Sequence, residues 1–267
     1  MNIFIEGLQG SGKSTLLKKL SQKYQEYHVY REGDYCPIEL AWCAYMTAEQ
    51  YAAAINRFPI LKKEIECRTT REEDKYIVEY TRIITAEREF YSYMEQYEIY
   101  NGRKTADDFN QIIFKRLRNL PVESAGNLFE CAFFQNIIEE LILFQQMSDD
   151  EICSFYRKLF DVIPKKDFRM YYLYSEDIED SIMKIRKERC DEKGNQVWYQ
   201  LLLKYLKESP YGKVYNFNGF EDVVSHFKHR QLVEMRIIRE IIGDYAVILQ
   251  AKKYTDEDLE VKVRSMS

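Results

Sequence analysis

Several features that mark particular classes of protein are missing from this sequence of 267 residues. Histidine occurs only 3 times, and the 6 cysteines are scattered, without Cys-x-x-Cys pairs or the Cys/His spacing of a zinc site. No apolar run is long enough to span a membrane, and no apolar leader precedes the first predicted strand. The net charge of −5 gives no overall basic field that would favour nucleic acid. We therefore expect a cytoplasmic protein with reduced cysteines that binds neither membrane nor nucleic acid.

Short apolar runs alternate with helical patterns along most of the chain. Helical spacing of leucines follows the first apolar run, and similar patterns cover residues 134–144 and 220–241. The apolar runs predict five strands, at residues 2–6, 28–31, 126–131, 169–174 and 213–217, with a further C-terminal strand at 245–251. This alternation predicts an α/β protein with a parallel five-stranded sheet and helices on both faces. The loops after its strands, at residues 7, 32, 131 and 175, are expected to face one crevice.

Residues 45–120 have a different pattern, which is highly charged and mostly helical. A capping box at Thr47–Gln50 predicts the start of one helix, and a longer helix is predicted over residues 72–97. Another is predicted from Thr105 to the residue before Pro121. The region shows too little β signal for a sheet of its own. We therefore predict a helical insertion within a single domain that covers residues 1–267.

The segment G-L-Q-G-S-G-K-S, residues 7–14, matches the phosphate-binding pattern G-x-x-x-x-G-K-[ST] in full. Glycines let backbone N–H groups close around a phosphate, and the following helix directs its positive end at the same anion. Lys13 is expected to contact the β- and γ-phosphates of ATP, and the Ser14 hydroxyl to bind Mg²⁺. The nucleotide is predicted to bind through Gly7, Gly10, Ser11, Gly12, Lys13, Ser14 and Thr15.

Three further positions are candidates for chemistry, each with an ordinary alternative. Glu130 closes a predicted strand and is a candidate for the metal site, although a strand-end carboxylate can simply face solvent. Glu32 follows the second predicted strand and is a candidate base for the acceptor hydroxyl, although acidic turns are common. Arg186 and Arg189 are three residues apart on a predicted helix. They are candidates for a lid that closes over the phosphates, and the alternative is that they lie on a solvated helix face.

The order of these parts resembles the thymidylate kinase and deoxynucleoside kinase branch of P-loop kinases. The start I-E-G-L-Q-G-S-G-K-S is similar to that of the family, as is Arg31-Glu32 after the second strand. The stretch Y-L-Y-S-E-D-I-E-D-S-I-M-K-I-R-K-E-R is similar to the family's fourth strand and arginine-bearing lid. The resemblance implies that an arginine near Arg82 or Arg88 binds the acceptor. One departure is that Cys131, rather than the family's arginine, follows Glu130.

Together these features predict an ATP-dependent kinase with a P-loop NTPase fold, in which ATP phosphorylates a nucleoside or nucleotide. Lys13, Glu32, Arg186 and Arg189 are its predicted catalytic residues, and Ser14 and Glu130 its predicted metal ligands. The alternative is a P-loop ATPase or nucleotide-dependent regulatory protein without a small-molecule acceptor. The missing arginine after Glu130 and the large helical region favour that alternative. A GTPase is disfavoured because no Asn-Lys-x-Asp motif occurs, and the sequence leaves a homodimer open.

Overall fold

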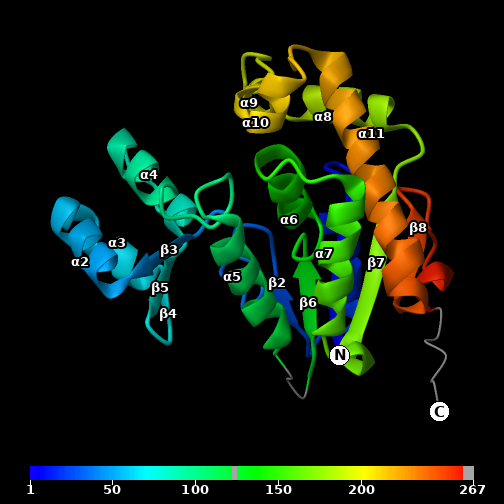
Figure 1. Ribbon diagram of the computed structural model, residues 1–267, viewed down its shortest axis with the longest axis horizontal. Helices are drawn as coiled ribbons and strands as arrows, with labels where there is room; N and C mark the ends of the chain where they lie inside the picture. Colours follow the sequence, from blue (N-terminus) through cyan, green and yellow to red (C-terminus); the bar gives the residue numbers. More distant parts are fainter. Residues whose placement is uncertain (122–124, 261–267) are drawn as a thin grey trace. The chain divides into compact units, whose positions relative to one another are not determined.

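The computed structural model describes residues 1–121 and 125–260, which pack into two compact units (Figure 1). One unit, called the core unit here, comprises Met1–Val29 and Val122–Ser267. The other, called the inserted unit, comprises Tyr30–Pro121 and interrupts the core unit in the sequence. Each is described by itself below.

A five-stranded sheet forms the centre of the fold, in the order β2-β6-β1-β7-β8. The central strand β1 pairs in parallel with β6 and β7, and β7 pairs in parallel with β8. The strands are β1 (Asn2–Gly7), β2 (His28–Tyr30), β6 (Asn127–Glu130), β7 (Phe168–Tyr174) and β8 (Ala246–Gln250). The predicted α/β class and parallel five-stranded sheet are therefore confirmed.

Helices cover both faces of this sheet because the side chains of β1 alternate between two apolar layers. Ile3 and Ile5 pack with the leucines of α1 (Lys13–Lys23). Phe4 points to the other face, where its ring centroid lies 5.7 Å from that of Phe133. On that face Tyr156 of α7 (Asp149–Asp161) packs against Phe133, and α11 (Phe220–Ile237) lies beside α7 (Figure 1).

The remaining helices of the core unit follow the strands along the chain. They are α6 (Gln135–Glu139), which continues into a π-helical turn at Glu140–Phe144, α8 (Ile178–Glu188), α9 (Val197–Glu208) and α10 (Pro210–Val214). A second π-helical turn at Ile238–Ile242 ends α11. Within residues 1–121 and 125–260, no helix combines the length and apolar character needed to cross a membrane.

The strand predicted at residues 213–217 is wrong, and the fifth strand is β8 instead. Residues 210–214 form α10, because Pro210 sets the helical φ of its first turn. The Ser209 hydroxyl accepts a hydrogen bond from Gly212 N at 2.9 Å, which caps this helix. The rings of Tyr211 and Tyr215 then pack one turn apart, with centroids separated by 4.3 Å. These local signals outweigh the β preference of the aromatic and valine residues.

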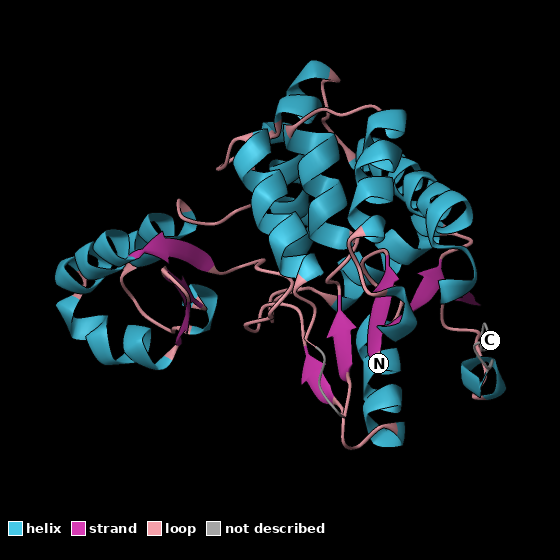
Figure 2. Ribbon diagram, turned by 60° about the horizontal axis from the view of Figure 1, so that its bottom comes forward, coloured by secondary structure: helices cyan, strands magenta, loops and turns pink. Residues whose placement is uncertain are grey.

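The inserted unit contains its own sheet, which contradicts the prediction that this region has too little β signal for one (Figure 2). Its three strands are antiparallel in the order β3 (Ala44–Thr47), β5 (Lys75–Val78) and β4 (Thr69–Glu72). The helix predicted over 72–97 is replaced by β5 and α4 (Arg88–Glu95), because Glu73, at φ 50°, turns the chain between β4 and β5. Its other helices are α2 (Ala48–Arg57), α3 (Lys62–Cys67) and α5 (Ala106–Arg118). The capping box of Thr47 and Gln50 is confirmed at the start of α2.

Candidate functional site

The glycine-rich segment forms a tight loop between β1 and α1. Gly7 and Gly10 have φ values of 139° and 75°, which favour glycine. A Cβ atom at Gly7 would lie 2.7 Å from the Leu173 carbonyl oxygen of β7, and one at Gly10 would lie 2.2 Å from Cδ1 of Ile185 in α8. Side chains at these two positions would therefore collide with the neighbouring strand and helix, and the loop can approach them only without one.

Lys13 begins α1 and folds back over the start of this loop. Its Nζ donates hydrogen bonds to the carbonyl oxygens of Gly7 at 2.9 Å and Leu8 at 3.0 Å. The side chain is buried, so its ammonium group lies close to the loop and is largely shielded from solvent. A buried ammonium that is bonded only to neutral carbonyls in this contact has more to gain from an anion than a solvated one.

Ser14 and Glu130 come together as the predicted metal site requires. Glu130 ends β6, in register with Ile5 of β1, and its Oε1 accepts a hydrogen bond from Ser14 Oγ at 2.5 Å. A hydroxyl and a carboxylate are the hard oxygen donors that Mg²⁺ prefers, and Mg²⁺ usually takes few protein ligands beside phosphates and water. Among the described residues no cluster of three or more histidine, cysteine, aspartate or glutamate side chains could hold a metal alone. The Ser14 hydroxyl and the Glu130 carboxylate fit a metal that takes its remaining ligands from a nucleotide and water.

The other predicted loop residues surround this pair. Gly12 is the N-cap of α1, and Thr15 is exposed on the first turn of that helix. The Ser11 hydroxyl is buried and has no hydrogen-bond partner among the described residues. The main-chain N–H of Ser11 donates to Leu8 O at 3.2 Å, which closes the turn.

Glu32, the predicted base, lies in the inserted unit and is exposed. It sits in the turn after β2, which Asp34 N closes by donating to Arg31 O at 3.1 Å. Asp34 pairs with Arg82, whose Nε also donates to Gly33 O at 3.2 Å. Arg82 is therefore tied to this turn, and the role of Glu32 stays a prediction.

Of the two predicted lid arginines, Arg186 lies on α8 and Arg189 directly follows it. This helix packs against the glycine-rich loop through Ile185. The Arg186 guanidinium lies 4.0 Å from the ring centroid of Tyr199, and its Nε donates to Gln196 Oε1 at 2.9 Å. Arg189 follows the last residue of α8, is exposed and lies 5.2 Å from the ring centroid of Trp198. Both arginines are engaged by α9 and the residue before it, so their action as a lid stays a prediction.

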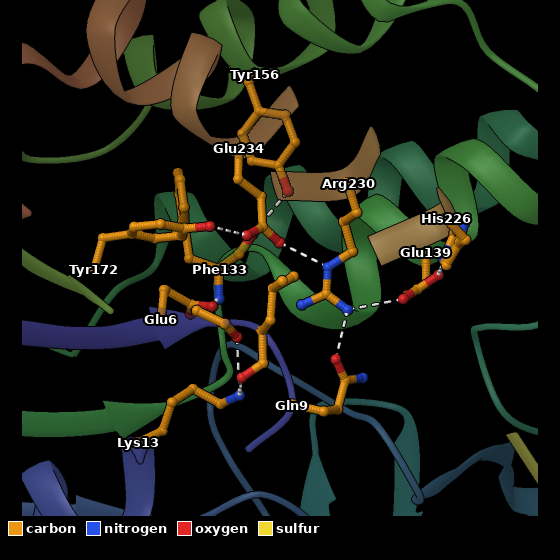
Figure 3. A network of polar contacts seen from close by, with 12 residues as sticks. Glu6, Gln9, Lys13, Phe133, Glu139, Tyr156, Tyr172, His226, Arg230 and Glu234 are labelled. Carbon is orange, nitrogen blue, oxygen red and sulfur yellow. Dashed lines mark hydrogen bonds and ion pairs between the residues drawn. The ribbon is translucent and has the colours of Figure 1, made fainter. Parts of the chain in front are cut away.

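A buried polar layer beside the loop was missed by the sequence analysis (Figure 3). Its centre is Arg230 of α11, which is 0% exposed. Arg230 Nε donates to Glu234 at 2.7 Å, and Nη1 donates to Glu139 at 2.8 Å and to Gln9 Oε1 at 3.0 Å. Tyr172 donates to Glu234 at 2.5 Å, and His226 Nε2 lies 2.7 Å from Glu139. The available signal was the spacing of His226, Arg230 and Glu234, which places three polar residues on one face of a largely buried helix.

Two carboxyl groups of this layer have strongly shifted pKa values. Burial raises the pKa of Glu6 to about 8, although Phe133 N donates to its Oε1 at 2.7 Å. Burial would also raise the pKa of Glu139, but His226 and Arg230 outweigh it and lower that pKa to about 2. Burial therefore favours the neutral form of Glu6, whereas His226 and Arg230 favour the ionised form of Glu139.

Neither a scan against models of known protein families nor a search of curated proteins found a match for this chain. The proposals that follow therefore depend on the geometry of the site and on the resemblance in the loop sequence.

Proposed function

We propose that this protein is an ATP-dependent phosphotransferase of the P-loop NTPase fold, similar to thymidylate and deoxynucleoside kinases. Its substrate is a small acceptor of the nucleoside or nucleotide class, and it acts in the cytoplasm. One observation supports the proposal above the others. The loop from Gly7 to Ser14 joins a buried parallel strand to a helix, with Lys13 folded over it and Ser14 bonded to Glu130. A buried lysine, a helix start and an oxygen-donor pair therefore lie on one short loop, which is the arrangement that binds phosphate in P-loop proteins.

In this proposal Lys13 exchanges its two carbonyl partners for oxygens of the β- and γ-phosphates. The exchange is favourable because a charge-assisted bond to phosphate is stronger than a bond to a neutral carbonyl. Ser14 and Glu130 are the residues that would hold Mg²⁺, which would supply positive charge against the phosphates when bound. Glu32 accepts the proton of the acceptor, and Arg186 with Arg189 stabilises the transferring group after turning from their present partners.

The replacement Lys13→Ala tests this function directly. We expect it to weaken binding of Mg-ATP by at least about 10-fold and to abolish phosphate transfer, because the buried cation is lost. The matched control is Lys18→Ala, which removes an exposed lysine from the same helix. Titration calorimetry with Mg-ATP and release of ADP with a panel of nucleosides and nucleotides provide the readouts. Equal affinity and turnover in wild type and Lys13→Ala would refute the proposal.

A second candidate is a P-loop ATPase or nucleotide-dependent regulatory protein without an acceptor. It is favoured by the residues after Glu130, where Cys131 and Ala132 are buried and no arginine is present at either position. The engagement of Arg186 by Gln196 and Tyr199 favours it too. The same panel separates the two candidates, since a kinase releases ADP faster with one class of acceptor. An ATPase or regulator releases ADP at one rate with every compound.

A further inference from the structure

Arg230 holds the side chain of Gln9 in one orientation. A guanidinium can only donate hydrogen bonds, so the oxygen of the Gln9 amide must be the atom that faces it. Arg230 Nη1 lies 3.0 Å from this oxygen, Oε1. Because the amide is planar, its NH₂ group is then directed away from Arg230, as Figure 3 shows. The half-buried Gln9 thus presents two N–H donors from the phosphate loop.

The carboxylates around Arg230 explain how it can hold Gln9 without drawing the phosphate to itself. Glu234 and Glu139 accept hydrogen bonds from its Nε and Nη1, and both carboxylates are buried. Two acidic partners offset the positive charge of one arginine, and the fully buried guanidinium stays behind the loop. Its Nη2 has no hydrogen-bond partner among the described residues. What reaches the loop surface is therefore a neutral, oriented amide.

The position of Gln9 in the loop indicates which phosphate it would meet. Lys13 Nζ, which in P-loop proteins reaches the β- and γ-phosphates, is bonded to the carbonyls of Gly7 and Leu8. These two residues immediately precede Gln9, whereas the start of α1 lies at the other end of the loop. The end of the loop that carries Gln9 is thus the end beside the lysine ammonium. A terminal phosphate is the group expected there.

We propose that the Gln9 amide donates to the γ-phosphate of ATP and that Arg230 is the positioning residue that orients this amide. This inference rests on the proposed function, because it assumes that ATP occupies the loop. It adds a contact that would distinguish ATP from ADP, since ADP lacks the γ-phosphate. Arg230 acts through Gln9 and touches no nucleotide atom.

The test compares the affinities for Mg-ATP and Mg-ADP by titration calorimetry. Gln9→Ala should weaken ATP binding by about 10-fold and change ADP binding less than about 2-fold, because only the γ-phosphate loses a donor. Gln9→Glu should weaken ATP binding further. The substitution removes the amide donors and places a negative charge beside the γ-phosphate, which repels it. Lys13→Ala should instead weaken the binding of both nucleotides.

Arg230→Met tests the positioning role, and thermal melting shows whether this variant is folded. The folded variant should lose ATP affinity to about the same extent as Gln9→Ala, with ADP affinity again unchanged. The double variant should lose no more than either single one, because both changes remove one contact. Tyr156→Phe is the matched control, since it removes a buried hydrogen bond to Phe133 O on the same face of the sheet without touching Arg230. If Arg230→Met does not fold, the two Gln9 variants still decide the γ-phosphate contact.

The outcomes separate this inference from the proposed function. Wild type that binds neither nucleotide would overturn both. Wild type that binds ATP, with Lys13→Ala defective and Gln9→Ala retaining the wild-type ratio of ATP to ADP affinity, would overturn only the inference. Loss of ADP affinity equal to that of ATP in Gln9→Ala would also overturn it, because the contact would then lie at another phosphate.

Discussion

The helices α8 and α11 both place arginines close to the glycine-rich loop, but the surroundings of these arginines differ. On α8 the guanidinium groups of Arg186 and Arg189 lie against aromatic rings, and Arg189 is exposed. On α11 the Arg230 guanidinium is fully buried between Glu139, Glu234 and Gln9. An exposed arginine can change partner at little cost, whereas a buried one with two carboxylate partners cannot. We therefore expect the arginines at α8 to change partners readily and Arg230 of α11 to keep one orientation.

The largest effect expected from this difference is on stability. Arg230→Met leaves Glu139 and Glu234 buried without their shared cation, which should lower the free energy of unfolding by about 3–5 kcal/mol. Arg189→Ala should change it by less than about 0.5 kcal/mol, because its side chain is exposed. Urea unfolding can be followed in a Trp42→Phe background, where Trp198 reports on the core unit. Equal losses in the two variants would contradict the comparison.

A second effect tests the buried layer through pH. The pKa of Glu6 is about 8 in the folded protein against an ordinary value of 4.5, so between about pH 5 and pH 8 only the folded state keeps the proton. Its contribution to stability is complete below the ordinary pKa and is lost as pH rises through the folded one. The stability advantage of Glu6→Gln over wild type should therefore grow by roughly 3 kcal/mol from pH 5 to pH 8. Chemical unfolding across this range measures it, with exposed Glu26→Gln as control. A constant difference would mean that Glu6 is ionised in the folded protein.

The third prediction concerns Arg186 and Arg189 at α8. Their replacement should change stability least of the three but should clearly slow turnover. If Arg189 acts as a lid, Arg189→Ala should slow phosphate transfer by about 10²-fold and change ATP affinity far less. Arg186→Ala should act in the same direction, while Lys187→Ala, an exposed cation on the same helix, should leave the rate unchanged. Single-turnover kinetics give these rates. Wild-type rates in both arginine variants would assign them to the surface of the helix.

The parts that could be predicted from the sequence are those fixed by short-range patterns. The loop at residues 7–14 carries its own conformational requirements. Glu130 meets Ser14 because Glu130 ends β6 and Ser14 lies at the start of the helix that follows β1, the parallel neighbour of β6. The prediction of a strand at 213–217 was wrong because the Ser209 cap and Pro210 override the β preference of the following residues. The inserted sheet was not predicted because its strands have only four residues each, and two of the three contain charged residues.

The buried layer could not be predicted because its partners are far apart in the sequence. Arg230 and Gln9 are separated by 221 positions, and nothing near either residue identifies the other. Only the fold brings α11 beside the loop that follows β1. A helical spacing of three polar residues shows that they share a face, but a shared face is equally compatible with solvent. Burial, which decides between the two, is a property of tertiary packing.

The position of the inserted unit in the chain has a consequence for how this protein could diversify. The chain leaves the five-stranded sheet at β2 and returns at β6, and these two strands are neighbours. His28 N donates to Gly126 O at 3.0 Å, so the two crossings lie side by side. Residues 30–121 could therefore be lengthened, shortened or exchanged without changing the strand order of the five-stranded sheet. The loop, Lys13, Ser14, Glu130 and Arg230 all belong to the other unit, so such an exchange would leave their contacts with one another within a single unit.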